Sequence, residues 1–142
     1  MGKRNKKIVA VSGGFDPIHV GHVRMILDAA KLGDVVVIAN SDEWLMRKKG
    51  YVFMEYEQRQ EVLYAIKGVI DVVEAWDEDD TVCKTLARIK PDIFANGGDR
   101  KDGNVPEYEV CEKLGIQMRF GVGGSDKPQS SSWLVDKVRK QK

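Results

Sequence analysis

Short runs of β-branched and apolar residues alternate along the whole chain with segments of helical periodicity. This alternation is typical of a parallel sheet whose crossovers place helices on both faces. We therefore expect an α/β fold, a Rossmann-like, doubly wound, five-stranded parallel sheet, with residues 1–142 in a single domain. The predicted strands are 8–12, 35–40, 70–75, 92–96 and 116–121, and the predicted helices are 20–32, 56–67, 81–89, 106–114 and 131–140.

The segment 13–22 reads Gly-Gly-Phe-Asp-Pro-Ile-His-Val-Gly-His and follows the first predicted strand directly. In doubly wound sheets, ligands bind beyond the carboxyl ends of the strands, where the strand order reverses. The start of a helix attracts anions, and His19 and His22 add side chains that titrate near neutral pH. The segment therefore predicts a phosphate site. Surface histidines and half of a metal site are the alternatives, and the second is weakened because the chain has two His and no Cys at ligand-like spacing.

Three other polar segments follow predicted strands. The segment 40–50 is expected to be a loop that ends in Lys48 and Lys49, and Arg59 lies in the helix that comes next. Cations at this edge suit a triphosphate, but a solubilising loop and a surface pair of Arg59 with Glu55 fit equally well. Gly97, Gly98 and Asp99 fit either close approach to a ligand or a plain turn. The run 130–132, three serines, fits a helix cap, a phosphate cradle, or both.

The bulk composition excludes some classes of partner. The formal net charge is +1, which gives no broad attraction to nucleic acid or to a membrane surface. Residues 1–7 form a basic stretch that we expect to be a solvated tail. No membrane span or signal peptide is visible, and two widely spaced Cys indicate reduced thiols, so a cytoplasmic location is expected. Trp44, Trp76 and Trp133 are expected to serve packing, and the acidic run 77–80 to lead into a helix or to border a partner surface.

At segment 13–22 the chain resembles the HxGH nucleotidyltransferase superfamily, in particular its small cytidylyltransferase-like branch, whose signature reads G-x-F-D-x-x-H-x-G-H. The resemblance implies transfer of CMP or AMP from CTP or ATP, with Mg²⁺, to a small phosphorylated sugar, polyol or amino alcohol, releasing pyrophosphate. It implies a homodimer and no metal ligand on the chain itself. The residues that it implies are His19, His22, Lys49 and Arg59 for catalysis, with Lys48 in reserve, and Gly13, Gly14, Phe15, Asp16, Gly21, Gly98, Asp99, Ser130, Ser131 and Ser132 for nucleotide binding.

Two groups within this superfamily are similar to different parts of the chain. The helix start at 56–59 resembles glycerol-3-phosphate cytidylyltransferases, whereas the segments 79–81, 90–92 and 97–99 resemble heptose-1-phosphate adenylyltransferases. The glycerol-phosphate enzymes carry R-T-E-G before the last hydroxyl run, where this chain has Gly-Gly-Ser-Asp-Lys at 123–127. The base, the acceptor and the role of Asp16 therefore stay open. A catalytically silent, nucleotide-binding regulatory module of the same fold is the alternative function.

Overall fold

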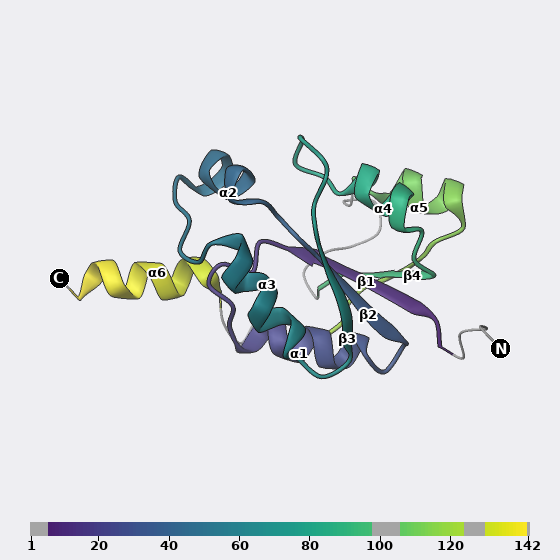
Figure 1. Ribbon diagram of the computed structural model, residues 1–142, viewed down its shortest axis with the longest axis horizontal. Helices are drawn as coiled ribbons and strands as arrows, with labels where there is room; N and C mark the ends of the chain where they lie inside the picture. The colour runs from purple at the N-terminus through teal and green to yellow at the C-terminus, as the bar shows by residue number, and fades with distance from the viewer. Residues whose placement is uncertain (1–5, 98–105, 124–129, 142) are drawn as a thin grey trace.

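The computed structural model describes residues 6–97, 106–123 and 130–141 (Figure 1). Their strands form one five-stranded sheet with the order β3-β2-β1-β4-β5, and every pair of neighbours is parallel. The predicted fold class is confirmed. The strands are β1 (Ile8–Gly13), β2 (Asp34–Ala39), β3 (Val69–Glu74), β4 (Ile93–Ala95) and β5 (Gln117–Arg119).

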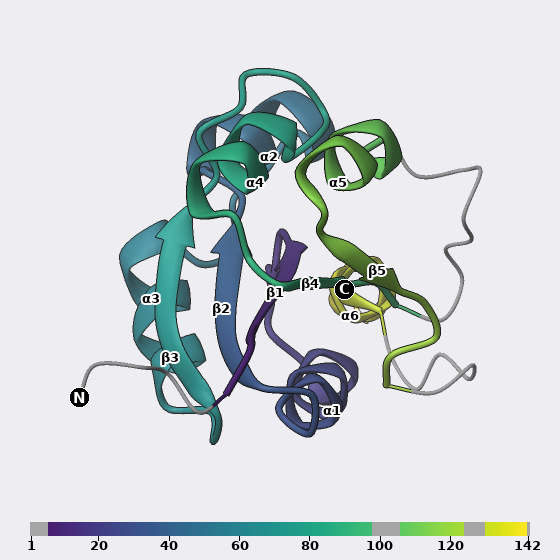
Figure 2. The same ribbon diagram turned by 90° about the vertical axis from the view of Figure 1, so that its right-hand side faces the viewer.

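Helices cover both faces of the sheet (Figure 2). The helices are α1 (Val20–Ala29), α2 (Asp42–Lys49), α3 (Tyr56–Tyr64), α4 (Cys83–Ile89), α5 (Tyr108–Leu114) and α6 (Ser131–Lys140). Side chains alternate between the two faces of a strand, so Val9 packs with α1 and α3 in one buried cluster while Ala10 packs with α4 and α5 in the other. The central strand is thus buried from both sides.

The segment that we expected to be a loop after β2 is instead the helix α2. Ser41 accepts a hydrogen bond from the amide of Trp44 and so caps the helix start. Gly50 ends the helix at φ 83°, a left-handed conformation that glycine adopts without strain. Only Leu45 of this helix is buried, so its sequence shows little apolar periodicity.

The other predicted elements are present, with differences at their ends. Four helices are shorter than predicted: α1 and α3 end early, at Ala29 and Tyr64, whereas α4 and α5 begin late, at Cys83 and Tyr108. The edge strand β5 keeps three residues of the six expected. Helix and strand ends depend on capping and on pairing with neighbours, which apolar patterns do not report.

The strand order reverses at β1, since β2 and β3 lie on one side of it and β4 and β5 on the other. The carboxyl end of β1 is Gly13, which pairs with Ala39 of β2. This edge of the sheet is the position at which doubly wound proteins bind their ligands. Helix α6 extends away from the layered body (Figure 1), and its first turn is bound to this edge through the Ser131 hydroxyl, which donates to the carbonyl of Pro17 at 2.8 Å.

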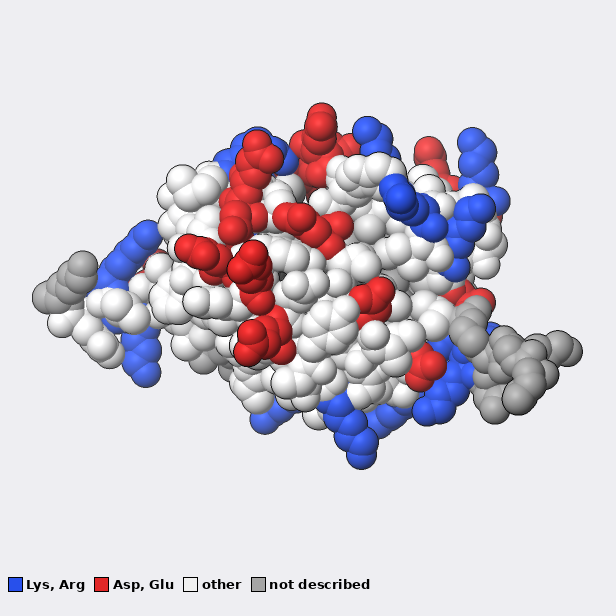
Figure 3. All heavy atoms as spheres, viewed as in Figure 1, with Lys and Arg blue, Asp and Glu red and all other residues white. Residues whose placement is uncertain are grey.

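One face of the molecule is strongly acidic. Figure 3 shows Asp and Glu side chains gathered across the middle of the face that contains α3 and β3, with Lys and Arg mostly at its border. A polyanion is repelled from such a surface. The carboxyl edge of the sheet, with its histidines and lysines, is the better place for phosphate groups.

Candidate functional site

The candidate site is built around the loop that joins β1 to α1. Gly13 ends the strand, Gly14 lies against Leu45 of α2, and Phe15 is 2 % exposed with φ 53°. A Cβ atom on Gly14 would come within 3.2 Å of the Leu45 side chain, so the approach of α2 favours glycine here. Gly21 lies in the first turn of α1.

The two histidines cap α1 with their own rings. His19 is the N-cap residue, and its Nδ1 accepts a hydrogen bond from the Gly21 amide at 3.0 Å. His22 Nδ1 accepts from the His19 amide at 3.2 Å. Together they form a capping box in which two imidazoles replace the usual hydroxyl and carboxylate. A neutral ring that accepts at Nδ1 carries its proton on Nε2, so both rings offer an Nε2–H donor.

The rings are stacked, and the surroundings of His22 favour its neutral form. The ring centroids of His19 and His22 are 3.8 Å apart, and the Phe15 ring meets His22 edge-on at 4.8 Å. Burial, followed by the electrostatic effects of His19 and Lys49, lowers the pKa of His22 to about 3. Without a ligand, His22 is therefore a neutral donor at physiological pH. A bound polyanion would raise its pKa again.

The two lysines at the end of α2 have different surroundings. Lys48 forms an ion pair with Asp80 at 3.1 Å, and both side chains are exposed. Lys49 is exposed and lies close enough to His22 for its charge to lower the pKa of that imidazole. The structure thus brings Lys49 to the histidines and holds Lys48 toward the acidic run.

Arg59 lies in a different environment from the one we predicted. Its side chain is fully buried, and its guanidinium donates to the carbonyls of Met54, Gly14 and Asn40 and to the carboxylate of Asp42, at 2.7 to 2.9 Å. These bonds use four of its five N–H groups. A group enclosed in this way does not offer its charge to a phosphate, so this geometry does not fit the expectation that Arg59 grips the triphosphate directly.

Asp16 is also fully buried. Its two carboxylate oxygens accept hydrogen bonds from the amides of Phe53 and Met54, at 2.7 and 2.5 Å. Both oxygens therefore face the backbone of the segment between α2 and α3. No side-chain pattern predicts this contact, because the partners are backbone amides far along the chain.

The serine run 130–132 lies at the start of α6, beside the loop of residues 14–19 that joins β1 to α1 and that we call the histidine loop. Ser130 is the N-cap residue, but its side chain makes no capping hydrogen bond and instead lies 3.0 Å from the Ser132 hydroxyl. Ser131 is buried against Pro17, whereas Ser132 is exposed. The run is thus bound to the loop of the candidate site rather than serving as a simple side-chain cap.

The segment after β4 reaches the same edge. Asn96 is buried next to the end of the strand, and its carbonyl accepts from the Val122 amide at 3.0 Å. The predicted nucleotide-binding residues Gly98 and Asp99 lie outside the described residues, as do residues 1–5 of the basic tail.

The structure gives the acidic run 77–80 a capping role and leaves two of the tryptophans, which we expected to serve packing, largely exposed. Asp77 caps α4 by accepting hydrogen bonds from the amides of Lys84 and Thr85, and Asp80 pairs with Lys48.

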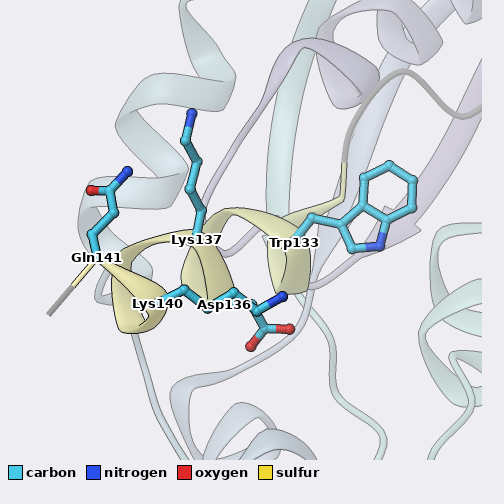
Figure 4. A pocket seen from close by; sticks show the side chains of 5 residues that line it. All are labelled: Trp133, Asp136, Lys137, Lys140 and Gln141. Carbon is cyan, nitrogen blue, oxygen red and sulfur yellow. The ribbon is translucent and has the colours of Figure 1, made fainter.

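Trp76 and Trp133 are 59 % and 53 % exposed, so they do not belong to the core. Figure 4 shows Trp133 at one end of a groove of about 370 Å³ along α6, lined also by Asp136, Lys137, Lys140 and Gln141. None of these groove residues is among the predicted site residues.

Within the part of the chain that the structure describes, no group of three or more His, Cys, Asp or Glu side chains is placed to hold a metal ion. Asp16, the carboxylate nearest in sequence to the histidines, already has both oxygens bound to amides. Among the same residues, no helix is both long and apolar enough to cross a membrane.

The sheet order and the ligand edge define a Rossmann-like α/β domain. A family model described as cytidylyltransferase-like matches residues 10–116, and the chain belongs to this family. The chain is 41 % identical over 112 residues to the FAD synthase of Ferroglobus placidus, covering 79 % of this chain and 72 % of that protein. It is 38 % identical over 138 residues to the bifunctional protein HldE of Hahella chejuensis, covering 95 % of this chain but 28 % of that protein.

The chain thus spans little more than a quarter of the length of the HldE relatives it matches. Among solved structures, the lipopolysaccharide core biosynthesis protein from Thermoplasma volcanium is similar, with a TM-score of 0.63 and 28 % identity. That match covers 80 % of this chain and 93 % of the other. A protein from Archaeoglobus fulgidus has the same fold, with a TM-score of 0.58 at 20 % identity over 87 % of this chain and 95 % of that one.

Proposed function

We propose that this protein is a nucleotidyltransferase that transfers CMP or AMP from CTP or ATP to a small phosphorylated sugar, polyol or amino alcohol, releasing pyrophosphate. One observation carries the proposal: two stacked imidazoles, each hydrogen-bonded at Nδ1 and carrying a donor at Nε2, lie at the start of α1 beside the Lys49 charge. This arrangement fits a polyanion at the carboxyl edge of the sheet. Membership of the cytidylyltransferase-like family supports the same reaction.

In the proposed reaction a phosphate oxygen of the acceptor attacks the α-phosphorus of the nucleotide. A new phosphorus–oxygen bond forms, the bond to the bridging oxygen breaks, and pyrophosphate leaves with that electron pair. This reaction needs no side-chain nucleophile, so the contribution of the chain is to position two polyanions and to stabilise the charge that grows on the bridging oxygen. We assign this stabilisation to the Nε2–H donors of His19 and His22 and to the ammonium of Lys49.

The remaining binding residues in the proposal follow from their places around the loop. The backbone of Gly13, Gly14 and Phe15 and the first turn of α1 at Gly21 approach the phosphates, and Ser132 offers an exposed hydroxyl from α6. Ser130, hydrogen-bonded to Ser132, and Ser131 support that hydroxyl. Gly98 and Asp99 keep the nucleotide-binding role that the resemblance implies, although they lie outside the described residues.

Magnesium enters the proposal as part of the nucleotide substrate. In the proposal the phosphate oxygens of the nucleotide hold the ion. When bound, Mg²⁺ neutralises charge on the outer phosphates. We derive no step of the chain's own residues from it.

The choice between ATP and CTP is a matter for assay. The FAD synthase relative is named for a product, flavin adenine dinucleotide, that contains an adenylyl group, so ATP is the first nucleotide to test. The assay follows pyrophosphate release in the presence of Mg²⁺ with each of ATP, CTP, GTP and UTP, against a panel of sugar, polyol and amino-alcohol phosphates. Sustained release that requires both substrates supports the proposal.

The same assay separates catalysis from the alternative, a silent nucleotide-binding module. A binding module saturates in a calorimetric titration with nucleotide and releases no pyrophosphate with any acceptor. The homodimer that the resemblance implies is a separate proposal. Sedimentation at several protein concentrations tests it, and a single species of 16.0 kDa at all of them would refute it.

A further inference from the structure

Two buried charges of opposite sign hold the same short stretch of backbone. Asp16 accepts the amides of Phe53 and Met54, and Arg59 donates through Nε to the carbonyl of Met54 at 2.9 Å. Both side chains are fully buried. Charged groups are rarely buried unless they are fully paired, so this arrangement must be compensated by the bonds that it makes.

Arg59 extends this contact to both ends of α2. Besides Met54, which follows α2, the guanidinium binds the carboxylate of Asp42 in the first turn of α2 at 2.7 Å. It also binds the carbonyls of Gly14 in the histidine loop and Asn40 at the end of β2, both at 2.7 Å. One side chain therefore connects the loop after β1, the end of β2 and both flanks of α2.

Apolar packing fixes α2 through few side chains. Leu45 is its one fully buried residue, and Trp44 is half-buried with its indole nitrogen out of solvent. Its two contacts with the acidic run, Lys48 with Asp80 and Arg47 with the carbonyl of Glu78, are both exposed. Exposed ion pairs contribute little to stability. The position of Lys49 at the end of this helix thus depends chiefly on the buried contacts of Asp16 and Arg59.

We propose that Asp16 and Arg59 are positioning residues that clamp the segment 51–55 onto the histidine loop and thereby hold Lys49 beside His22. Neither touches the substrate. This inference rests on the proposed function for its catalytic meaning, but the geometry that it describes exists without any ligand.

The first test measures the ligand-free protein. The chain has two His, so each imidazole signal can be followed by NMR as a function of pH. Among the described residues, the titrating groups that act on His22 are His19 and Lys49, together with burial. Lys49→Ala should raise the pKa of His22. Asp16→Asn, which releases the segment 51–55, should raise it as well, although loss of a nearby carboxylate by itself would lower it.

The decisive comparison is the double variant Asp16→Asn with Lys49→Ala. If Asp16 acts by placing Lys49, the double variant has the His22 pKa of Lys49→Ala alone. A further rise in the double variant would mean that Asp16 merely limits the exposure of His22, and it would overturn the proposal. Asp80→Asn is the matched control, because it removes an exposed carboxylate that also contacts α2, and it should leave the titration unchanged.

The second test measures turnover in the wild type, in Asp16→Asn, in Lys49→Ala and in the double variant. Asp16→Asn alone should lower kcat about 100-fold, the scale of a small misplacement of a catalytic group, with a smaller change in KM. In the Lys49→Ala background the same substitution should change kcat less than about threefold. If the losses of kcat in the two single variants multiply in the double variant, the proposal is overturned. Arg59→Lys, which cannot bridge Gly14, Asn40 and Asp42 together, should act in the same direction.

Failure of the clamp and failure of the proposed function are distinguishable. If the wild type releases no pyrophosphate but the titrations are coupled as described, the clamp stands and the proposed reaction is wrong. If pyrophosphate is released but Asp16→Asn leaves both the His22 titration and kcat unchanged, the clamp is wrong and the reaction stands.

Discussion

The two nitrogens of the His22 ring have different partners, so substitution can separate its structural from its catalytic contribution. Nδ1 accepts the His19 amide within the capping box, and Nε2–H faces away from that contact. Glutamine is favoured at this third position of a capping box. We therefore expect His22→Gln to keep the cap while losing the imidazole donor, and His22→Ala to lose both.

The expected magnitudes follow from these contacts. Loss of a donor to developing charge costs about 3 kcal/mol, so kcat should fall by two orders of magnitude or more in both variants. Loss of the cap costs about 1 kcal/mol, and the edge contact with Phe15, at 4.8 Å, adds roughly 0.5–1.5 kcal/mol. The Tm of His22→Ala should therefore fall by roughly 5–8 °C. The Tm of His22→Gln, which keeps the cap but loses the same ring contact, should fall by roughly 2–5 °C.

The assay pairs calorimetric unfolding with pyrophosphate release at saturating substrates. Leu27→Ala, at an exposed position of the same helix, is the control and should change neither quantity by much. A folded His22→Gln with near-normal kcat would refute the catalytic assignment. A Tm for His22→Ala equal to that of the wild type would refute the capping assignment.

Three other predictions test the same site. Lys49→Ala should weaken nucleotide binding and slow transfer, whereas Lys48→Ala, which removes an exposed ion pair, should have a milder effect. If steady-state kinetics show the larger loss for Lys48→Ala, the catalytic lysine is Lys48. The pKa of His22 falls from 6.5 to about 3 on folding, so the unfolded chain binds more protons than the folded chain between these pH values. The free energy of unfolding should therefore decrease as the pH falls through that range. Denaturant titrations should show a loss of roughly 2–4 kcal/mol relative to His22→Gln, and parallel pH curves would exclude the shift. Ser131→Ala should lower the ligand-free Tm, because it breaks the buried hydrogen bond to the Pro17 carbonyl. Ser132→Ala should raise the Kd for the nucleotide several-fold at nearly unchanged Tm. Unchanged affinity in calorimetry would remove Ser132 from the site.

The sequence by itself determined the layers of the fold and placed the candidate site residues at the carboxyl edge of the sheet. The apolar runs around Val9, Val36 and Phe94 predicted buried parallel strands, because strands covered on both faces require apolar side chains in both directions. Parallel strands bring their carboxyl ends to one edge, so the histidine loop and the serine run were expected to lie near each other. The bond from Ser131 to the Pro17 carbonyl shows that contact.

The helix α2 is an intermediate case. Its apolar periodicity is weak, but its ends carry capping signals: Ser41 before the first turn, Asp42 and Glu43 within it, and Gly50 after the last. Those residues could have predicted a helix where we expected a loop. Capping chemistry, more than the apolar pattern, defines this short and mostly exposed element.

Only the tertiary structure decided what the charged residues around the site do. In the sequence, Arg59 is an ordinary cation on a helix and Asp16 an ordinary acid in a loop, and most such residues are exposed. Their burial depends on backbone carbonyls and amides supplied by segments up to 45 positions away in the chain. Backbone groups are the same at every position of the sequence, so no pattern of side chains predicts where they converge. A cation that binds phosphate can therefore be told from one that holds the site together only once the chain is folded.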